Sequence, residues 1–355
     1  MTRSTDVFSS TALRWSRSKD PFLWILDQRL LPQSETWMPV RSTEDMIEAI
    51  QTLKVRGAPL IGVAAALSLA QTALRGTRAD VLVQEASRLR AARPTAVNLM
   101  NALDRMVRFV RTNPDPEAIA GEALAIAWED VDLCAKMAEI GASLIAEGDG
   151  VLTHCNAGAL ATAGVGTALG VIARAHGLGR KIHVFVDETR PLLQGGRLTA
   201  WEMGKLNVPY TLIADVMAAS VMAQGKIQKI FVGCDRVATN GDFANKIGTY
   251  AVAVLAHYHG IPFYVVGPHT TIDPHCESGK DIPIEQRDPQ EVRGAQGAFG
   301  SVTWAPAQAP VYNPSFDVTP ASLVTGWVMD TGLFDQDAVR NGALRMGQPS
   351  AARPR

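Results

Sequence analysis

Polar side chains follow several short apolar runs in the second half of this sequence. The stretch from His154 to Asn156 comes directly after one run, and the stretch from Asp187 to Arg190 follows the next. Asp215 follows a third run, and the stretch from Gly233 to Arg236 follows a fourth. In an open α/β sheet, ligands bind beyond the carboxyl ends of the strands. One edge of the predicted sheet therefore gathers a thiol and several carboxylates, which suits acid–base chemistry.

Cys155 is the thiol that follows the first of these apolar runs, and it precedes a run of small residues from Ala157 to Gly166. A thiol facing the start of a glycine-rich helix would be stabilised as a thiolate by the helix dipole. A buried, unreactive cysteine explains the same residue equally well. A zinc site that paired Cys155 with His154 would lack two further ligands at any standard spacing, so we expect no metal. Asp215 directly precedes a helical stretch, so its simplest interpretation is a helix N-cap.

Three corners of the sequence have the residue types that bind anions. In the stretch from Arg56 to Pro59, a cation precedes a small-residue turn and a proline suited to the first turn of a helix. Arg93 stands in the same way ahead of another predicted helix, and Asn245 and Lys246 are expected to open a third. Either arginine alone is more often a solvated surface charge, but a matched pair is harder to dismiss. The three corners fit a phosphorylated small molecule bound without a metal.

A second interpretation comes from Gly164, Gly166 and Gly170, which form a GxGxxxG pattern after a strand. Asp187 follows the next strand, about where a dinucleotide-binding protein has its ribose-binding acid. A nicotinamide-dependent dehydrogenase is therefore an alternative. The glycine spacing is one residue too long, however, and close helix packing explains these glycines equally well.

The hydrophobic pattern predicts the elements that position these residues. Short apolar runs that alternate with helical stretches after Gly148 indicate βαβ units and a parallel sheet. The predicted strands are Phe22–Leu26, Trp37–Val40, Gly150–His154, Ile182–Val186, Thr211–Ile213, Lys229–Val232 and Pro262–Val266. The predicted helices are Glu44–Leu53, Pro59–Leu74, Ala79–Ala91, Ala96–Thr112, Gly164–Ala175, Thr199–Leu206, Asp215–Gln224 and Lys246–His259.

The fold class that follows is α/β, a Rossmann-like parallel-sheet domain preceded by a smaller, mainly helical N-terminal domain. We expect the N-terminal domain to cover residues 1–145 and the catalytic domain to cover residues 146–345. The tail from Arg345 to Arg355 holds two prolines and three arginines, and we expect residues 346–355 to be disordered.

Composition narrows the possible partners. The 355 residues carry 34 basic and 35 acidic side chains, a net charge of −1, which argues against a nucleic-acid binder that works by bulk electrostatics. The N-terminus has no apolar segment of the kind that directs secretion, and the apolar stretches carry too many polar residues for a bilayer span. The four cysteines are far apart and indicate no disulfide framework. We therefore expect a cytoplasmic protein that acts on a small molecule, with no membrane association.

Longer strings carry a resemblance to a known family. They read RGAP followed by LIGVAAA, RPTAVNL, THCNAGALATAGVGTALGVI, VDETRPLLQGGRLTAWEM, GCDRVATNGDFANKIGTY, IPIEQRDPQEV and NPSFDVTP. Together they closely resemble methylthioribose-1-phosphate isomerases, in the same order, from about Leu26 to Phe334. The departures are few: Cys234 replaces the usual small residue before the acid, and Gly196 stands where alanine is more common.

The resemblance implies a homodimer that needs no cofactor and whose Rossmann-like domain binds no nucleotide. It implies conversion of 5-methylthioribose 1-phosphate to 5-methylthioribulose 1-phosphate in methionine salvage. Matched onto this sequence, the family's acid is Asp235 and its thiol is Cys155. The matched substrate and phosphate contacts are Arg56, Gly57, Ala58, Arg93, Gln194, Asn245 and Lys246.

The chemistry of such a substrate explains this set. Phosphate blocks the anomeric oxygen, so the sugar cannot open to an aldehyde until an acid protonates the ring oxygen, a role we expect for Asp235. Hydrogen then leaves the neighbouring carbon either as a proton taken by Cys155 or as a hydride, with Cys155 stabilising the transition state. Relatives of the same fold leave other functions open: isomerases of 5-deoxyribose 1-phosphate or ribose 1,5-bisphosphate, and non-catalytic regulatory subunits of a translation-initiation exchange factor.

Overall fold

The computed structural model describes residues 4–18, 20–93 and 96–345. It divides the chain into an N-terminal unit, which runs to Leu133 and also takes Ala159–Gly164, and a C-terminal unit, which holds Cys134–Gly158 and the chain from Val165 onward. The division differs from a boundary at residue 145 because helix α5 (Pro116–Ala142) runs through both units. The tail at 346–355 lies outside the described residues.

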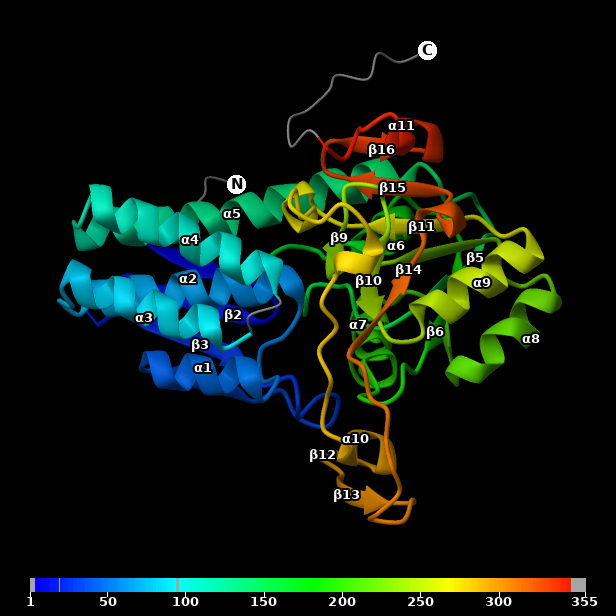
Figure 1. The fold of residues 1–355 in the computed structure, drawn as a ribbon, viewed down its shortest axis with the longest axis horizontal. Coiled ribbons are helices and arrows are strands. Elements are labelled where there is room, and N and C mark those ends of the chain that lie inside the picture. Colours follow the sequence, from blue (N-terminus) through cyan, green and yellow to red (C-terminus); the bar gives the residue numbers. More distant parts are fainter. Residues whose placement is uncertain (1–3, 19, 94–95, 346–355) are drawn as a thin grey trace. The chain divides into compact units, whose positions relative to one another are not determined.

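The N-terminal unit contains a four-stranded antiparallel sheet in the order β1-β2-β3-β4 (Figure 1). Helix α2 packs against β3 and against three other helices, and it is buried along most of its length, since its residues are almost all apolar. The predicted strands and helices of this unit are confirmed to within two residues, but β1 and β2 were not predicted. The bounds are β1 Val7–Ser9, β2 Leu13–Ser16, β3 Phe22–Leu26, β4 Trp37–Val40, α1 Thr43–Gln51, α2 Ala58–Leu74, α3 Ala79–Ala91 and α4 Val97–Thr112.

The C-terminal unit is built on a seven-stranded sheet in the order β16-β15-β11-β8-β5-β6-β7, so the predicted α/β class is confirmed. All neighbouring strands are parallel except the pair β15 and β16. From β5 the chain adds β6 and β7 on one side and then returns to add β8 and β11 on the other. The topological switch point therefore lies between β5 and β8. The strands are β5 Gly150–Thr153, β6 His183–Asp187, β7 Tyr210–Ile213, β8 Lys229–Val232, β11 Phe263–Val266, β15 Gly326–Met329 and β16 Gly332–Phe334.

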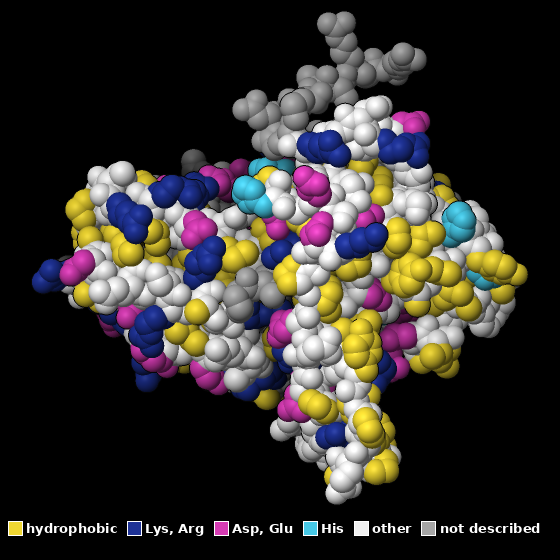
Figure 2. All heavy atoms as spheres, in the orientation of Figure 1, with side chains coloured by type: hydrophobic (Ala, Val, Ile, Leu, Met, Phe, Trp, Pro, Cys, Tyr) yellow, Lys and Arg dark blue, Asp and Glu magenta, His cyan; other side chains and the backbone are white. Residues whose placement is uncertain are grey.

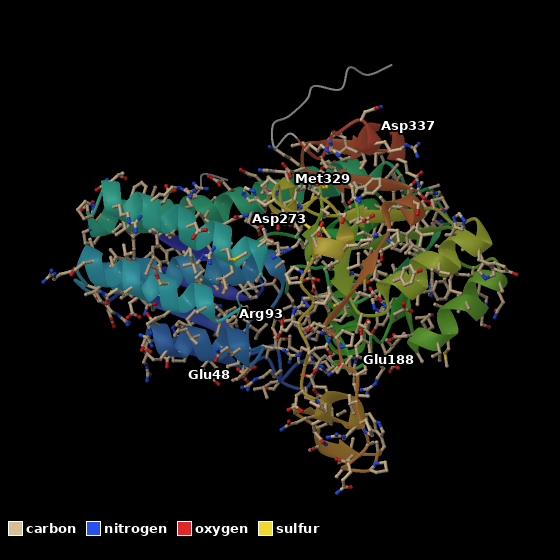
Figure 3. All side chains as sticks on the ribbon, in the orientation of Figure 1. Glu48, Arg93, Glu188, Asp273, Met329 and Asp337 are labelled. Carbon is tan, nitrogen blue, oxygen red and sulfur yellow. The ribbon has the colours of Figure 1, made fainter. Side chains whose placement is uncertain are left out.

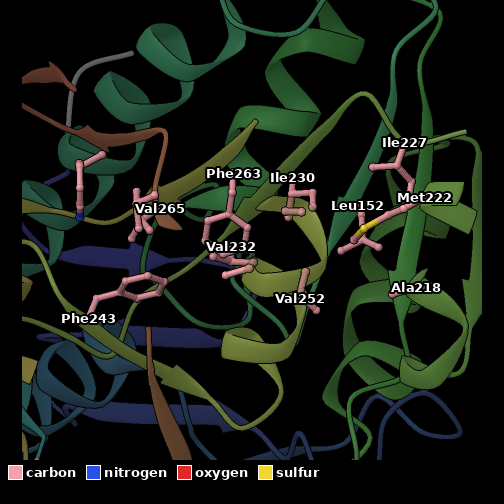
Figure 4. Close-up of a cluster of buried hydrophobic side chains, with 14 of the residues drawn as sticks. Leu152, Ala218, Met222, Ile227, Ile230, Val232, Phe243, Val252, Phe263 and Val265 are labelled. Atoms are coloured by element: carbon pink, nitrogen blue, oxygen red, sulfur yellow. The ribbon is translucent and has the colours of Figure 1, made fainter. Parts of the chain in front are cut away.

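Apolar side chains of the central strands form the core of this unit (Figure 4). Leu152 of β5, Ile230 of β8 and Val265 of β11 lie in one cluster of buried residues with Val252 of helix α9. Strands that are buried on both faces read as continuous apolar runs, which is why the sequence located them well. The helices of the sheet are α6 Ala168–Gly177, α7 Ala200–Lys205, α8 Ala218–Ala223 and α9 Thr249–His259.

Smaller elements follow β8. A three-stranded sheet in the order β14-β10-β9 was not predicted, and it contains Asn245 and Lys246, which were expected to open a helix. A hairpin of β12 and β13 follows helix α10, and α11 follows β16. No helix of the described chain is both long and apolar enough to cross a membrane. The bounds are β9 Arg236–Val237, β10 Phe243–Lys246, α10 Gln290–Arg293, β12 Gly294–Gly297, β13 Gly300–Thr303, β14 Phe316–Thr319 and α11 Gln336–Arg340.

Candidate active site

The loops that carry Cys155 and Asp235 leave the sheet side by side at the switch point. Strands β5 and β8 are hydrogen-bonded neighbours, with Leu152 opposite Ile230, and both loops follow the carboxyl ends of their strands. The two loops also touch: a Cβ atom on Gly233 would lie only 2.9 Å from the Ala157 Cβ. The structure thus places the predicted thiol and the predicted acid at the edge where ligands of this fold class bind.

Cys155 is partly exposed and is held in an uncommon conformation. Its φ angle is +64°, in the left-handed region that non-glycine residues rarely adopt. The backbone N–H of Cys155 donates to Thr189 Oγ1 at 2.8 Å, and Thr199 Oγ1 donates to the Cys155 carbonyl at 2.6 Å. Thr189 itself has a φ angle of +67°, although it is β-branched. Strained residues of this kind persist where surrounding bonds fix them, and they cluster at functional sites.

A buried histidine–aspartate pair involves the residue that precedes this cysteine in the chain. His154 Nδ1 is 3.1 Å from Asp187 Oδ2, and both side chains are inaccessible to solvent. Burial by itself would lower the pKa of His154. The hydrogen bond to Asp187 and the charges of Asp187 and Asp215 outweigh burial and raise that pKa above its usual value.

Asp215 supports the same loop rather than capping a helix. Its two carboxylate oxygens accept hydrogen bonds from the backbone N–H groups of Thr189, at 2.6 Å, and Arg190, at 2.8 Å. The N-cap interpretation of Asp215 is therefore wrong: the short helical turn that begins there has no side-chain cap. The Asp215 oxygens that an N-cap would use are occupied by the N–H groups of the loop after β6.

His154, Asp187 and Asp215 also have the composition of a metal site, with ligand atoms all within 4.8 Å of one another. The donors, however, are already engaged. His154 uses both ring nitrogens, one with Asp187 and one with the Ile247 carbonyl, and Asp215 uses both oxygens. One remaining oxygen of Asp187 does not make a coordination shell, so we assign no metal to this group.

Asp235 is partly exposed, and its backbone N–H donates to the Ala244 carbonyl at 2.9 Å, which fixes the loop against β10. Its neighbour Cys234 points elsewhere, because its sulfur occupies the space that a side chain on Gly267 would need. Burial, with a smaller contribution from the Asp235 charge, raises the pKa of the Cys234 thiol far above its usual range. Both cysteines are partly exposed, but the raised pKa keeps the Cys234 thiol neutral, so Cys155 is the better candidate for a thiolate.

Three predicted substrate contacts of the C-terminal unit are buried. Lys246 Nζ donates to the Ser315 carbonyl at 2.7 Å, and Asn245 Nδ2 donates to Thr249 Oγ1 at 2.9 Å. Both residues lie on β10, so the prediction that they open a helix is wrong, while their role in binding an anion stays a prediction. Gln194 is 5% exposed, and its Oε1 has no partner among the described residues. It precedes a π-helical turn at Gly195–Thr199, a distortion that is frequent at functional sites.

The remaining predicted contacts lie in the N-terminal unit. Helix α2 begins at Ala58 after Gly57, with proline in its first turn, as the sequence predicts, and Arg56 is 8% exposed. Gly57 has a φ angle of +98°, and a Cβ atom there would lie 2.5 Å from the Ala161 Cα. Arg93 lies in the link between α3 and α4 (Figure 3). The two residues after it, at 94–95, are outside the described residues.

The dehydrogenase alternative loses its ribose-binding acid. Asp187 is buried and bonded to His154, so it cannot reach a nucleotide. Gly166 packs against Gly158, where a Cβ atom would lie 2.5 Å from the Gly158 Cα. Helix α6 begins only at Ala168, later than expected, because the residues before it form this contact.

Comparison with known proteins places the chain in a family. A family model described as the initiation factor 2 subunit family matches residues 54–336. The methylthioribose-1-phosphate isomerases of Klebsiella pneumoniae subsp. pneumoniae and Cronobacter sakazakii are each 58% identical, over 95% of this chain and 98% of theirs. The chain belongs to the methylthioribose-1-phosphate isomerase family. The family expected from the sequence strings is thus confirmed, and the chain is an enzyme of the aldose–ketose isomerase type.

Solved structures agree with this assignment. The 5-methylthioribose 1-phosphate isomerase from Pyrococcus horikoshii is 41% identical, with a TM-score of 0.83 over 97% of this chain and 95% of that one. A structure named translation initiation factor eIF-2B, subunit delta, from A. fulgidus is 38% identical, with a TM-score of 0.80 over 93% of this chain and 97% of that one. The fold is therefore shared with proteins that are named for translation initiation.

Proposed function

We propose that this protein converts 5-methylthioribose 1-phosphate to 5-methylthioribulose 1-phosphate, as a cytoplasmic enzyme of methionine salvage. The proposal rests on the positions of Cys155 and Asp235, which lie in touching loops at the switch point of the sheet. The chain is also 58% identical to an isomerase named for this substrate. A sugar phosphate also suits the cations that the sequence singled out, Arg56, Arg93 and Lys246.

The proposed mechanism begins with Asp235 as the general acid. It gives its proton to the ring oxygen, and the bond between that oxygen and the anomeric carbon breaks. In the proton-transfer version, Cys155 as thiolate takes a proton from the neighbouring carbon, the electrons of that C–H bond form the double bond of an enol phosphate, and the thiol returns the proton to the anomeric carbon. The hydroxyl proton of the enol passes back to Asp235, so atoms balance. In the hydride version, hydrogen moves with its electron pair from the neighbouring carbon to the anomeric carbon, the neighbouring hydroxyl gives its proton back to Asp235, and Cys155 stabilises the transition state.

Substrate binding is assigned to two groups of residues. In the N-terminal unit, Arg56 with the backbone of Gly57 and Ala58, and likewise Arg93, offer a helix start and guanidinium groups that suit a phosphate. In the C-terminal unit, Gln194, Asn245 and Lys246 offer amide and ammonium groups that suit a sugar phosphate. The buried Oε1 of Gln194, which has no partner in the described part of the chain, supports its share of this assignment.

The test is phosphorus and proton NMR of the purified protein with 5-methylthioribose 1-phosphate, without added metal or nucleotide. We expect loss of the anomeric proton signal and appearance of the ketose phosphate. Turnover in heavy water then separates the two versions, because solvent deuterium enters the product only by proton transfer through an exchangeable thiol.

Variants test the residue roles in the same assay. Cys155→Ser and Asp235→Asn should each lower kcat by about a hundredfold or more, while Cys276→Ser, at a buried cysteine outside the site, should not change it. Near-wild-type turnover by a folded Cys155→Ser or Asp235→Asn protein would show that the proposed chemistry is wrong.

A non-catalytic role is the second candidate, because the chain is 38% identical to a structure named for an initiation factor subunit. That role predicts no turnover of 5-methylthioribose 1-phosphate, 5-deoxyribose 1-phosphate or ribose 1,5-bisphosphate. Comparing the three sugar phosphates in one assay also identifies which of them the enzyme prefers as its substrate. A preference for the bisphosphate would contradict the apolar 5-substituent that we propose.

We also propose that the enzyme is a homodimer. Tyr250, Val254 and Tyr258 recur every four residues on α9 and are 45%, 42% and 82% exposed, so they form an apolar stripe on one helix face. Figure 2 shows hydrophobic side chains gathered over α9. An exposed patch of this kind is typical of an interface. Sedimentation should give a dimer that Val254→Asp converts to a monomer, and a monomeric wild-type protein would contradict the proposal.

A further inference from the structure

His154 is placed where it can fix the geometry of the active site without touching the substrate. Its side chain is 0% exposed, and both ring nitrogens face acceptors: Asp187 Oδ2 at 3.1 Å and the Ile247 carbonyl oxygen at 2.9 Å. A carbonyl oxygen has no proton to give, so Nε2 must carry one and donate it. The only open question for this ring is whether Nδ1 is protonated as well.

The charges around the ring favour the doubly protonated form. Asp187 faces it from the end of β6, Asp215 from the turn after β7, and Asp317 from β14, while Glu188 adds its charge next to Asp187. Burial raises the pKa of Asp187, and the hydrogen bond from His154 opposes that rise. A protonated His154 compensates the buried negative charge of Asp187. A buried carboxylate without such a partner would cost more free energy than the pair.

The same ring joins three loops that carry predicted site residues. His154 precedes Cys155 in the chain, Asp187 leads into the loop whose Thr189 hydroxyl accepts from the Cys155 N–H, and Ile247 directly follows Lys246. The fit is close, since a Cβ atom on Gly248 would lie 2.8 Å from the His154 Cε1. The ring therefore sets the spacing between the loop after β5 and the loop after β10.

We propose that His154, as an imidazolium paired with Asp187, is a positioning residue that holds the loop of Cys155 in its left-handed conformation and at a fixed spacing from the strand of Asn245 and Lys246. The inference rests on the proposed isomerase function. Without the positive charge, Asp187 and Asp215 repel each other, and the loop of Thr189 and Cys155 loses the arrangement that keeps it strained.

Steady-state kinetics of His154→Gln give the first test. The glutamine amide can still donate to the Ile247 carbonyl but cannot replace the charge. We expect kcat to fall by thirtyfold or more, with KM within about threefold, because Cys155 acts mainly in the transition state. Asp187→Asn removes the partner charge and should reproduce this split. His183→Gln is the matched control: His183 begins the same strand β6, its Nε2 bonds the Thr211 hydroxyl at 2.8 Å, and its replacement should leave both constants unchanged.

NMR of protein labelled with ¹⁵N at its seven histidines gives a readout that a purely structural role would not move. In wild-type protein at pH 8 we expect the signal of one histidine ring with both nitrogens protonated. This signal should be absent from His154→Gln, and the His154 ring should be neutral in Asp187→Asn. This measurement on wild-type protein decides the charge state even if the variants fail to fold. A neutral His154 at pH 8, or a His154→Gln protein with kcat within twofold of wild type, overturns the inference. Failure of the proposed function looks different, because wild-type protein would then show no turnover at all.

Discussion

Asp130 offers a quantitative test of the electrostatics in the N-terminal unit. This α5 residue is 7% exposed, and its Oδ2 accepts a 2.6 Å hydrogen bond from the backbone N–H of Ala163. Burial raises the pKa of Asp130 to about 6, although hydrogen bonds from Ala163 and Gly164 oppose the rise. Asp130 therefore holds the segment Ala159–Gly164 against α5, and its contribution to the free energy of unfolding depends on pH.

The sign and size of the effect follow from linkage. An unfolded chain gives Asp130 its ordinary pKa near 3.9, about two units below the native value, so the native state binds the proton more tightly. Its contribution to stability is fully present below about pH 4 and is lost as pH rises through 6. Two units correspond to about 3 kcal/mol. Replacing Asp130 by asparagine removes the titration, so the variant should gain about 3 kcal/mol relative to wild type between pH 4 and pH 8.

Thermal unfolding at a series of pH values measures this difference. A gain of that size is about 4 °C in Tm if the whole chain unfolds together, and about 10 °C if the N-terminal unit unfolds alone. Glu117→Gln is the control, because Glu117 lies on the same helix with an exposed side chain. A difference between Asp130→Asn and wild type that stays flat from pH 4 to pH 8, or that slopes the other way, would refute the reasoning.

Three further predictions concern single residues. Gly57→Ala should cost at least about 2 kcal/mol, because alanine disfavours positive φ and its Cβ would collide with Ala161; an unchanged Tm would contradict this. Arg93→Ala should raise KM about tenfold or more with little change in kcat, since a phosphate contact is shared by ground and transition states; a loss of kcat alone would exclude that role. Iodoacetamide should modify Cys155 well before Cys234, whose thiol burial keeps neutral, as peptide mass spectrometry can show; equal rates would argue against the assigned environments.

Local sequence signals predicted the elements that are regular and strongly apolar. The strands Phe22–Leu26 and Lys229–Val232 and the helix Ala79–Ala91 match the structure residue for residue. The strand β10 was missed because Phe243–Lys246 is short and its pairing with β14 joins segments about 70 residues apart. Such pairing leaves no local pattern, so the residues before α9 were assigned to the helix itself.

The sequence by itself determined the family, the α/β class and the identity of the polar residues that end each strand, because motif strings and hydrophobic periodicity are local properties of the chain. Tertiary structure alone decided how those residues are used. It engaged Asp215 with the backbone of the Thr189 loop, buried Asp187 against His154, and turned the thiol of Cys234 away from the loop of Cys155. Each of these outcomes depends on contacts between segments far apart in the chain, whose distances no local pattern encodes.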